Sequence, residues 1–147
     1  MKKSGIYNAE LAKAVAKMGH GDIILIGDVG CPFPRHEMTT TVDLAVCEGV
    51  PRVADVLKAV LSELVVESYI VTDETKSVNP AVYEEFKKIL DKEDNKGNAL
   101  VEKCIPHVQM KDMWLNGGLR GEEVKVFVRC GERSPYCYIA LEAGVDF

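Results

Sequence analysis

The sequence has 147 residues and a net charge of −5, with 47% hydrophobic and 28% charged residues, an ordinary composition for a globular protein. It lacks the basic cluster of nucleic-acid-binding proteins and any apolar run near the roughly 20 residues that span a bilayer. The Met1-Lys2-Lys3 start is not followed by the apolar region of a signal peptide. We therefore expect one cytoplasmic domain over residues 1–147, with no nucleic-acid or membrane partner.

Apolar periodicity and Gly/Pro punctuation divide the chain into alternating helices and strands. Helices are predicted over residues 9–18, 52–64, 80–91 and about 107–115. Strands are predicted over residues 23–26, 41–47, 65–72, 100–105, 124–128 and 138–141. Loops or turns are predicted over residues 31–36, 73–80 and 91–98. The alternation implies crossover connections, so we expect an α/β fold: a single three-layer α/β/α sandwich with a mostly parallel sheet.

The stretch from Met18 to Gly30 places His20 just before a buried strand and Asp28 just after it. Residues 23–26 form a continuous apolar run, which is typical of a central strand covered on both faces. His20 lies between two glycines, where the chain can turn tightly and other groups can approach the backbone. This pattern fits a functional histidine, and it also fits a surface residue that follows the end of a helix.

Polar, titratable residues also follow other apolar elements: Glu74 with Lys76, His107, and the loop from Gly131 to Tyr136. Ligands of open α/β sheets bind in the loops beyond the strand ends. Each position has a plainer interpretation as well. The Glu74–Lys76 pair fits a solvated loop, His107 a helix-capping surface residue, and Tyr136 a packed aromatic ring with a wet hydroxyl.

Several familiar kinds of site are not indicated. The three histidines lack the H-E-x-x-H spacing of zinc enzymes, and the five cysteines contain no C-x2-C pair. There is no G-x-S-x-G nucleophile motif. Residues 27–30 lead into Pro32 and Pro34 and not into a helix N-terminus, which argues against a phosphate-binding loop. We therefore expect no metal and no nucleotide cofactor.

A series of short motifs runs in order through almost the whole chain. They are Met1–Lys3, Met18–Asp22, Asp28, Pro32-x-Pro34, Val42-Asp43, Gly49–Pro51, Asn79-Pro80, His107, Arg129-x-Gly131-Glu132-x-Ser134-Pro135-Tyr136 and Ala143–Val145. In this combination and order the chain resembles the D-ribose pyranase and L-fucose mutarotase family. The combination is far more specific than any one of the motifs.

The resemblance implies an isomerase that interconverts anomers or ring forms of a free aldose without a cofactor. By this resemblance His20 is the catalytic acid, and the sugar-binding residues are Asp28, His107, Tyr136, Cys137 and Tyr138. Arg129, Glu132 and Glu74 are assigned supporting roles. One position departs from the family pattern: Tyr138 stands where the tyrosine motif usually ends in asparagine, so a carboxamide that would bind a sugar hydroxyl is missing.

The proposed chemistry suits these residues. Opening a cyclic hemiacetal requires a proton to reach the ring oxygen while another leaves the anomeric hydroxyl. Histidine can serve both steps near neutral pH, because its unperturbed pKa is about 6.5. Gly19–Asp22 and Gly131–Arg133 resemble the fucose branch. The stretches that resemble the ribose branch are Pro32–Pro34, Gly49–Pro51 and Ser134–Tyr136. We lean narrowly to L-fucose, with D-ribose as the alternative.

A strand rises about 3.3 Å per residue, so His20 and Asp28 should lie roughly 20 Å apart within one chain. Family members form ring-built homo-oligomers, and the resemblance implies such an assembly here, for example a decamer. We therefore predict intersubunit sites that pair His20 of one copy with Asp28 of its neighbour. A non-catalytic sugar-binding or transport-accessory protein, or a histidine phosphocarrier that uses His20, stays open as an alternative.

Overall fold

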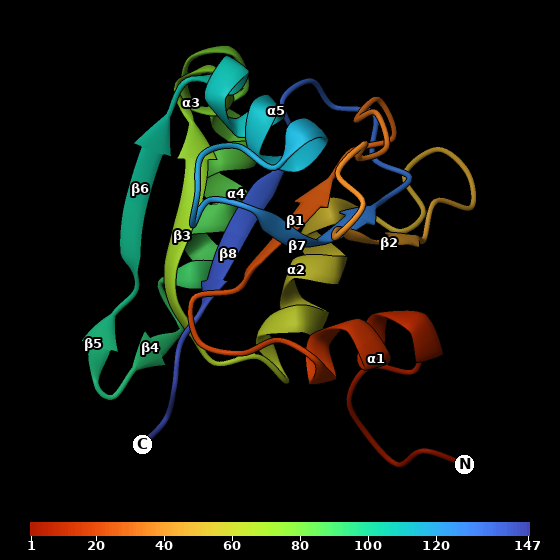
Figure 1. Cartoon of the computed structure of the whole chain (residues 1–147), viewed down its shortest axis with the longest axis vertical. Coiled ribbons are helices and arrows are strands. Elements are labelled where there is room, and N and C mark those ends of the chain that lie inside the picture. The colour runs from red at the N-terminus through yellow and green to blue at the C-terminus, as the bar shows by residue number, and fades with distance from the viewer.

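The structure is a computed structural model that describes residues 1–147. Its centre is a six-stranded sheet with the order β2-β7-β1-β8-β3-β6 (Figure 1). The strands are β1 (Ile23–Gly27), β2 (Thr40–Asp43), β3 (Val66–Thr72), β6 (Val101–Ile105), β7 (Val124–Arg129) and β8 (Ile139–Ala143). All neighbouring pairs are parallel except those of β8, which runs antiparallel to β1 and β3. The prediction of a mostly parallel sheet is confirmed.

Helices cover both faces of this sheet. They are α1 (Ala9–Ala16), α2 (Val53–Leu61), α3 (Asp73–Val78), α4 (Pro80–Leu90) and α5 (His107–Asn116). Ile24 and Ile26 of β1 pack with α1, α2 and α4, whereas Ile23 and Leu25 pack with α5 on the opposite face (Figure 1). Successive strand residues point to opposite faces, so a strand buried on both sides is apolar throughout. The three-layer α/β/α architecture is confirmed.

Local signals in the sequence set several helix ends. The Asn8 side chain accepts a hydrogen bond from the backbone N–H of Leu11 at 2.9 Å, which caps the start of α1. Pro80 occupies the first position of α4, where its missing N–H has no cost. Gly117 ends α5 with a φ of 95°, a left-handed conformation that glycine adopts readily.

Three predicted segments need correction. Residues 73–80 were expected to be a loop, but residues 73–78 form α3, whose start is capped by the Thr72 side chain on the Thr75 N–H. The strand expected over 41–47 ends at Asp43, because its partner β7 ends opposite it at Arg129. The turn expected over 91–98 contains a small hairpin of β4 (Asp94–Asn95) and β5 (Asn98–Ala99).

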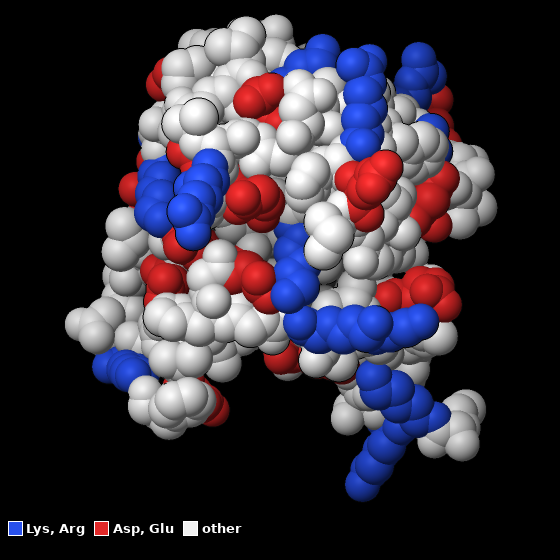
Figure 2. All heavy atoms as spheres, viewed as in Figure 1, with Lys and Arg blue, Asp and Glu red and all other residues white.

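The surface shows no dominant charge pattern on the face seen in Figure 2. Acidic and basic side chains alternate in small groups over its upper part, and a short run of basic side chains extends from its centre toward the lower right. Among the helices, none combines the length and the apolar character needed to span a bilayer.

Candidate active site at the carboxyl end of the sheet

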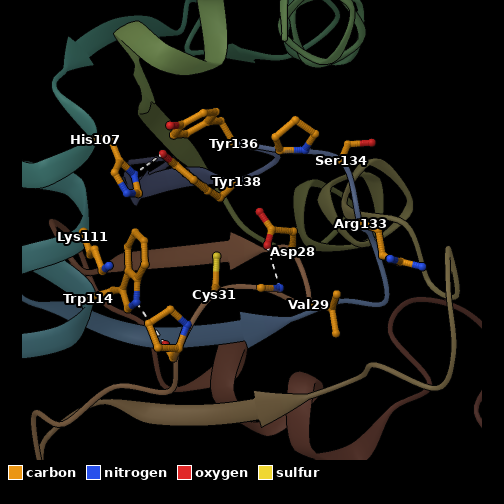
Figure 3. Close-up of a pocket in the computed structure, with 13 residues that line it drawn as sticks. Asp28, Val29, Cys31, His107, Lys111, Trp114, Arg133, Ser134, Tyr136 and Tyr138 are labelled. Atoms are coloured by element: carbon orange, nitrogen blue, oxygen red, sulfur yellow. Dashed lines mark hydrogen bonds between the residues drawn. The ribbon is translucent and has the colours of Figure 1, made fainter. Parts of the chain in front are cut away.

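A cavity of about 510 Å³ opens where the parallel strands end and β8 begins. Figure 3 shows its lining converging from the loop after β1, from α5 and from the loop before β8. The lining residues are Asp28, Val29, Gly30, Cys31, Pro32, His107, Lys111, Trp114, Arg133, Ser134, Pro135, Tyr136 and Tyr138. A cavity of this size accepts a small molecule such as a monosaccharide.

Asp28 directly follows β1 and is 9% exposed. Its carboxylate accepts a hydrogen bond from the Gly30 N–H at 2.8 Å. Burial raises the pKa of the Asp28 carboxyl above its ordinary value, although the backbone N–H of Gly30 and hydrogen bonds from Cys31 oppose this. The result is a buried acceptor at the floor of the cavity that a ligand hydroxyl can reach.

His107 begins α5 and faces an aromatic wall. Its ring lies 5.3 Å from that of Tyr136 and 5.6 Å from that of Tyr138, measured between centroids, with Trp114 at 6.2 Å. His107 Nδ1 forms a hydrogen bond with the Tyr138 hydroxyl, drawn as a dashed line in Figure 3. Burial raises the pKa of Tyr138, so its hydroxyl stays protonated near neutral pH. Flat apolar walls beside a few polar groups suit a sugar ring.

Glu74 acts on His107 through the backbone. Its Oε2 accepts the His107 N–H at 2.8 Å, so the Glu74 carboxylate caps the start of α5. A negative group at this end satisfies one of the unpaired N–H groups of the helix and is favoured by the helix dipole. Glu74 therefore positions α5 and does not line the cavity.

Glu132 organises the loop that carries Arg133, Ser134 and Tyr136. Its Oε1 accepts hydrogen bonds from the Arg133 and Ser134 N–H groups and from the Ser134 hydroxyl, at 2.9 to 3.2 Å. Its Oε2 lies 3.6 Å from Nε of Arg52. Burial alone would raise the pKa of Glu132, but these hydrogen bonds and Arg52 outweigh it and the pKa is lowered.

Tyr136 has a φ of 54°, a left-handed conformation that residues with side chains rarely adopt. Such a residue stores about 1–3 kcal/mol of strain and persists only where neighbours hold it. The Thr75 hydroxyl donates to the Tyr136 carbonyl at 3.0 Å, and the Asn79 side chain donates to the Pro135 carbonyl at 2.9 Å. Both residues come from the region of α3, which therefore holds this loop against the cavity.

The predicted sugar-binding run 136–138 is divided by the structure. Tyr136 and Tyr138 line the cavity, but Cys137 does not; its side chain is 2% exposed and packs into the core beneath α2 and α4. Cys137 and Tyr138, the two residues before β8, pack on opposite faces of the sheet, so the thiol points away from the cavity. Only the Cys137 backbone reaches the site, where it helps to lower the pKa of Asp28.

Arg129 also lies outside the cavity. Its Nη1 donates to Asp43 at 2.9 Å, its Nε donates to the Val29 carbonyl at 3.4 Å, and its guanidinium stacks 5.2 Å from the centre of the Phe33 ring. These contacts tie the end of β7 to β2 and to the loop after β1. Arg129 therefore supports the backbone next to Asp28 without facing a ligand.

His20 lies at the other end of β1, separated from Asp28 by the continuous strand Ile23–Gly27. Its side chain is 58% exposed, and Nε2 lies 3.1 Å from Oε2 of Glu67. It lines a second hollow of about 530 Å³ together with Asp22, His36 and residues around Lys125. Within one chain, the structure does not bring His20 together with the other predicted site residues.

Several cavity residues were not predicted from the sequence, and two of them lie on α5. Lys111 follows His107 by four positions, so both lie on one face of α5. Trp114 is 1% exposed, and its Nε1–H donates to the Pro32 carbonyl at 3.1 Å, which fastens α5 to the loop after β1. Lys111 and Trp114 follow His107 by four and seven positions, and this helical spacing could have predicted that they share its face of α5. No group of three or more His, Cys, Asp and Glu side chains is arranged to hold a metal ion.

Known proteins match this chain over almost its whole length. Residues 1–146 match the model of the RbsD / FucU transport protein family. The chain is 42% identical to a D-ribose pyranase of Lactobacillus acidophilus over the full length of both, and 37% identical to a D-ribose pyranase of Geobacillus thermodenitrificans over 100% of this chain and 99% of that one.

Solved structures show the same fold. Bacillus subtilis RbsD complexed with D-ribose has a TM-score of 0.82 and 31% identity, with full coverage of both chains. The fucose mutarotase of Streptococcus pneumoniae in complex with L-fucose has a TM-score of 0.68 and 18% identity, covering 94% of this chain and 93% of that one. At that identity the second likeness extends to the fold alone.

Proposed function

The chain belongs to the RbsD / FucU family, and from this premise we propose that it is a D-ribose pyranase, a cofactor-independent isomerase that interconverts the pyranose and furanose forms of free D-ribose. The observation that carries the proposal is the cavity that joins Asp28, His107 and Tyr136 in a chain matched end to end by D-ribose pyranases. The sequence alone had favoured L-fucose narrowly. The full-length relatives favour D-ribose, whereas the fucose enzyme is similar only in fold.

The reaction needs two proton movements. The bond between C1 and the ring oxygen breaks, the ring oxygen gains a proton, and the anomeric hydroxyl loses one to give the open-chain aldehyde. Closure by the C4 hydroxyl gives the furanose, and closure by the C5 hydroxyl gives the pyranose. Asp28 and His107 hold sugar hydroxyls, and the rings of Tyr136 and Trp114 form the walls.

The proton donor in this proposal is His20 of a neighbouring copy. Its exposed ring cannot reach the cavity of its own chain across β1. A ring-built homo-oligomer, for which a decamer is the expected form, would place it beside Asp28 of the next copy. The intersubunit site and the cytoplasmic location stay predictions.

NMR saturation transfer tests the function directly. D-ribose is examined with and without protein, and transfer between its pyranose and furanose signals is measured; L-fucose anomers serve as the second substrate. We expect accelerated exchange for D-ribose, with slower or unchanged exchange for L-fucose. Faster exchange for L-fucose than for D-ribose would indicate an L-fucose mutarotase. Unchanged exchange for both sugars, with binding retained, would favour a transport-accessory protein, and phosphorylation of His20 would favour a carrier.

A further inference from the structure

A chain of hydrogen bonds runs behind the cavity from His107 into the protein. His107 Nδ1 contacts the Tyr138 hydroxyl, which lies 3.3 Å from Oγ1 of Thr72. Oγ1 of Thr72 lies 2.9 Å from Oγ1 of Thr75, and the Thr75 hydroxyl donates to the Tyr136 carbonyl at 3.0 Å. This series of hydrogen bonds thus begins at His107, in the cavity, and ends at the carbonyl of Tyr136, the cavity residue with the left-handed backbone.

These groups are sealed from solvent. Thr72 and Thr75 have no exposed surface, and Tyr138 is 2% exposed. Each hydroxyl has a single hydrogen to donate, and buried polar groups in folded proteins are almost always paired. The direction of each hydrogen bond can therefore be assigned by following the hydrogens along the chain.

The assignment starts at the carbonyl, which can only accept. The Thr75 hydrogen goes to the Tyr136 carbonyl, so the Thr72 hydroxyl donates to Thr75. Oγ1 of Thr72 then accepts from the Thr75 N–H, at 3.2 Å, and from the Tyr138 hydroxyl. With the hydrogen of Tyr138 used, its oxygen is an acceptor, and His107 Nδ1 is the donor.

We propose that Thr75, Thr72 and Tyr138 are positioning residues that hold neutral His107 as its Nδ1–H tautomer, so that Nε2 offers a lone pair to a sugar hydroxyl. Nε2 makes no hydrogen bond to another protein group, and the His107 side chain lines the cavity (Figure 3). The opposite tautomer would leave the oxygens of Tyr138 and Thr72 facing each other with no hydrogen between them. That arrangement is unfavourable where water has no access.

The Tyr138 hydroxyl is not free to bind a ligand. In this chain the Tyr138 hydroxyl is occupied by Thr72 and His107. Of this hydrogen-bonded pair, it is therefore His107, through Nε2, that can accept a hydrogen bond from a sugar hydroxyl in the cavity. The ligand class rests on the proposed function, but the tautomer does not.

The tautomer is measurable without any sugar. Two-bond ¹H–¹⁵N NMR of protein with ¹⁵N-labelled histidine rings distinguishes Nδ1–H from Nε2–H, and the spectrum of His107→Gln identifies the His107 signals by their disappearance. At a pH where the ring is neutral, we expect His107 in the Nδ1–H form. An Nε2–H form in the wild-type protein would overturn the proposal outright.

The variant Thr75→Val tests the donor-to-acceptor direction of these hydrogen bonds. Thr75 itself lies outside the cavity, so the substitution does not change the cavity lining. Without the Thr75 oxygen, the Thr72 hydroxyl is free to donate to Tyr138, and Tyr138 to Nδ1, so His107 should convert to Nε2–H. Thr75→Ser keeps the hydroxyl and should retain the Nδ1–H form. An unchanged tautomer in folded Thr75→Val contradicts the proposal. If that variant does not fold, Tyr138→Phe replaces it, with the expected result a loss of the predominant Nδ1–H signal.

Sugar affinity provides the functional readout. We expect Thr75→Val to bind D-ribose about tenfold more weakly, as for one lost hydrogen bond, and Thr75→Ser to bind like the wild-type protein. Equal weakening in both variants would indicate a packing role and contradict the proposal. If D-ribose does not bind the wild-type protein at all, the proposed function fails while the tautomer measurement still stands.

Discussion

The two ends of β1 carry hollows of nearly equal size but different construction. At the carboxyl end, about 510 Å³ is lined by the buried Asp28 and by aromatic rings. At the amino end, about 530 Å³ surrounds His20, whose side chain is 58% exposed. Volume therefore does not distinguish them. The carboxyl end has buried, oriented polar groups suited to hold a sugar, and the amino end has an exposed histidine suited to reach another molecule.

The largest expected effect concerns His20, at the amino end of β1. His20→Ala should lower the rate of D-ribose ring exchange by about 10²- to 10⁴-fold, the usual loss of a general acid, while sugar binding at the carboxyl end is largely kept. Saturation transfer gives the rate, and calorimetric titration gives the affinity. His36→Ala is the matched control, because His36 lines the same hollow without an assigned role. Full exchange activity in His20→Ala would remove its catalytic assignment.

Mixing two impaired variants tests whether His20 of one copy and Asp28 of a neighbouring copy form one site. His20→Ala and Asp28→Asn subunits, unfolded and refolded together, should regain about a quarter of wild-type activity, because one half times one half of the interfaces then carry both native residues. Each variant refolded alone is the control. No recovery in verified mixed oligomers would contradict the intersubunit site.

Glu132→Gln should weaken the hydrogen bonds that hold the loop 131–136 at the carboxyl end of the sheet. A charged acceptor holds hydrogen bonds more strongly than a neutral one, so we expect a loss of about 1 kcal/mol in unfolding free energy at pH 7. The native pKa of Glu132 is lowered, so its stabilisation exists above the unfolded pKa and disappears as the pH falls through the native value. Urea denaturation at pH 7 and in acid should show the difference vanish. A difference independent of pH would contradict the assigned ionisation.

Asp28→Asn should have the smallest effect on stability, and in the opposite direction. Burial raises the native pKa of Asp28, so wild-type stability falls as the pH rises from the unfolded pKa through the native one. Asparagine lacks this penalty and can still accept the Gly30 N–H. We expect Asp28→Asn to gain stability relative to the wild-type protein between acid and neutral pH, measured by urea denaturation. Asp146→Asn, at an exposed position, is the control, and a relative loss would contradict the prediction.

The predictions from sequence succeeded where the signal was local. The apolar run 23–26, the cap at Asn8 and the proline at position 80 mark elements that the structure contains. The helix α3 was missed although Thr72 followed by two acidic residues is a capping pattern. Its polar composition resembled a loop, and only its contacts with the 131–136 loop and α5 show why it is ordered.

Sequence by itself determined most of the helices and strands of the main sheet, the family resemblance and the separation of His20 from Asp28, because periodicity, ordered motifs and strand length are properties of neighbouring residues. Tertiary structure decided which side chains share the cavity. Strand order brings Asp28, His107 and Tyr136 together and turns Cys137 into the core. It also places Thr72 and Thr75 behind His107. The physical reason is that such neighbours are joined by packing and hydrogen bonds between segments remote in sequence, which no local pattern records.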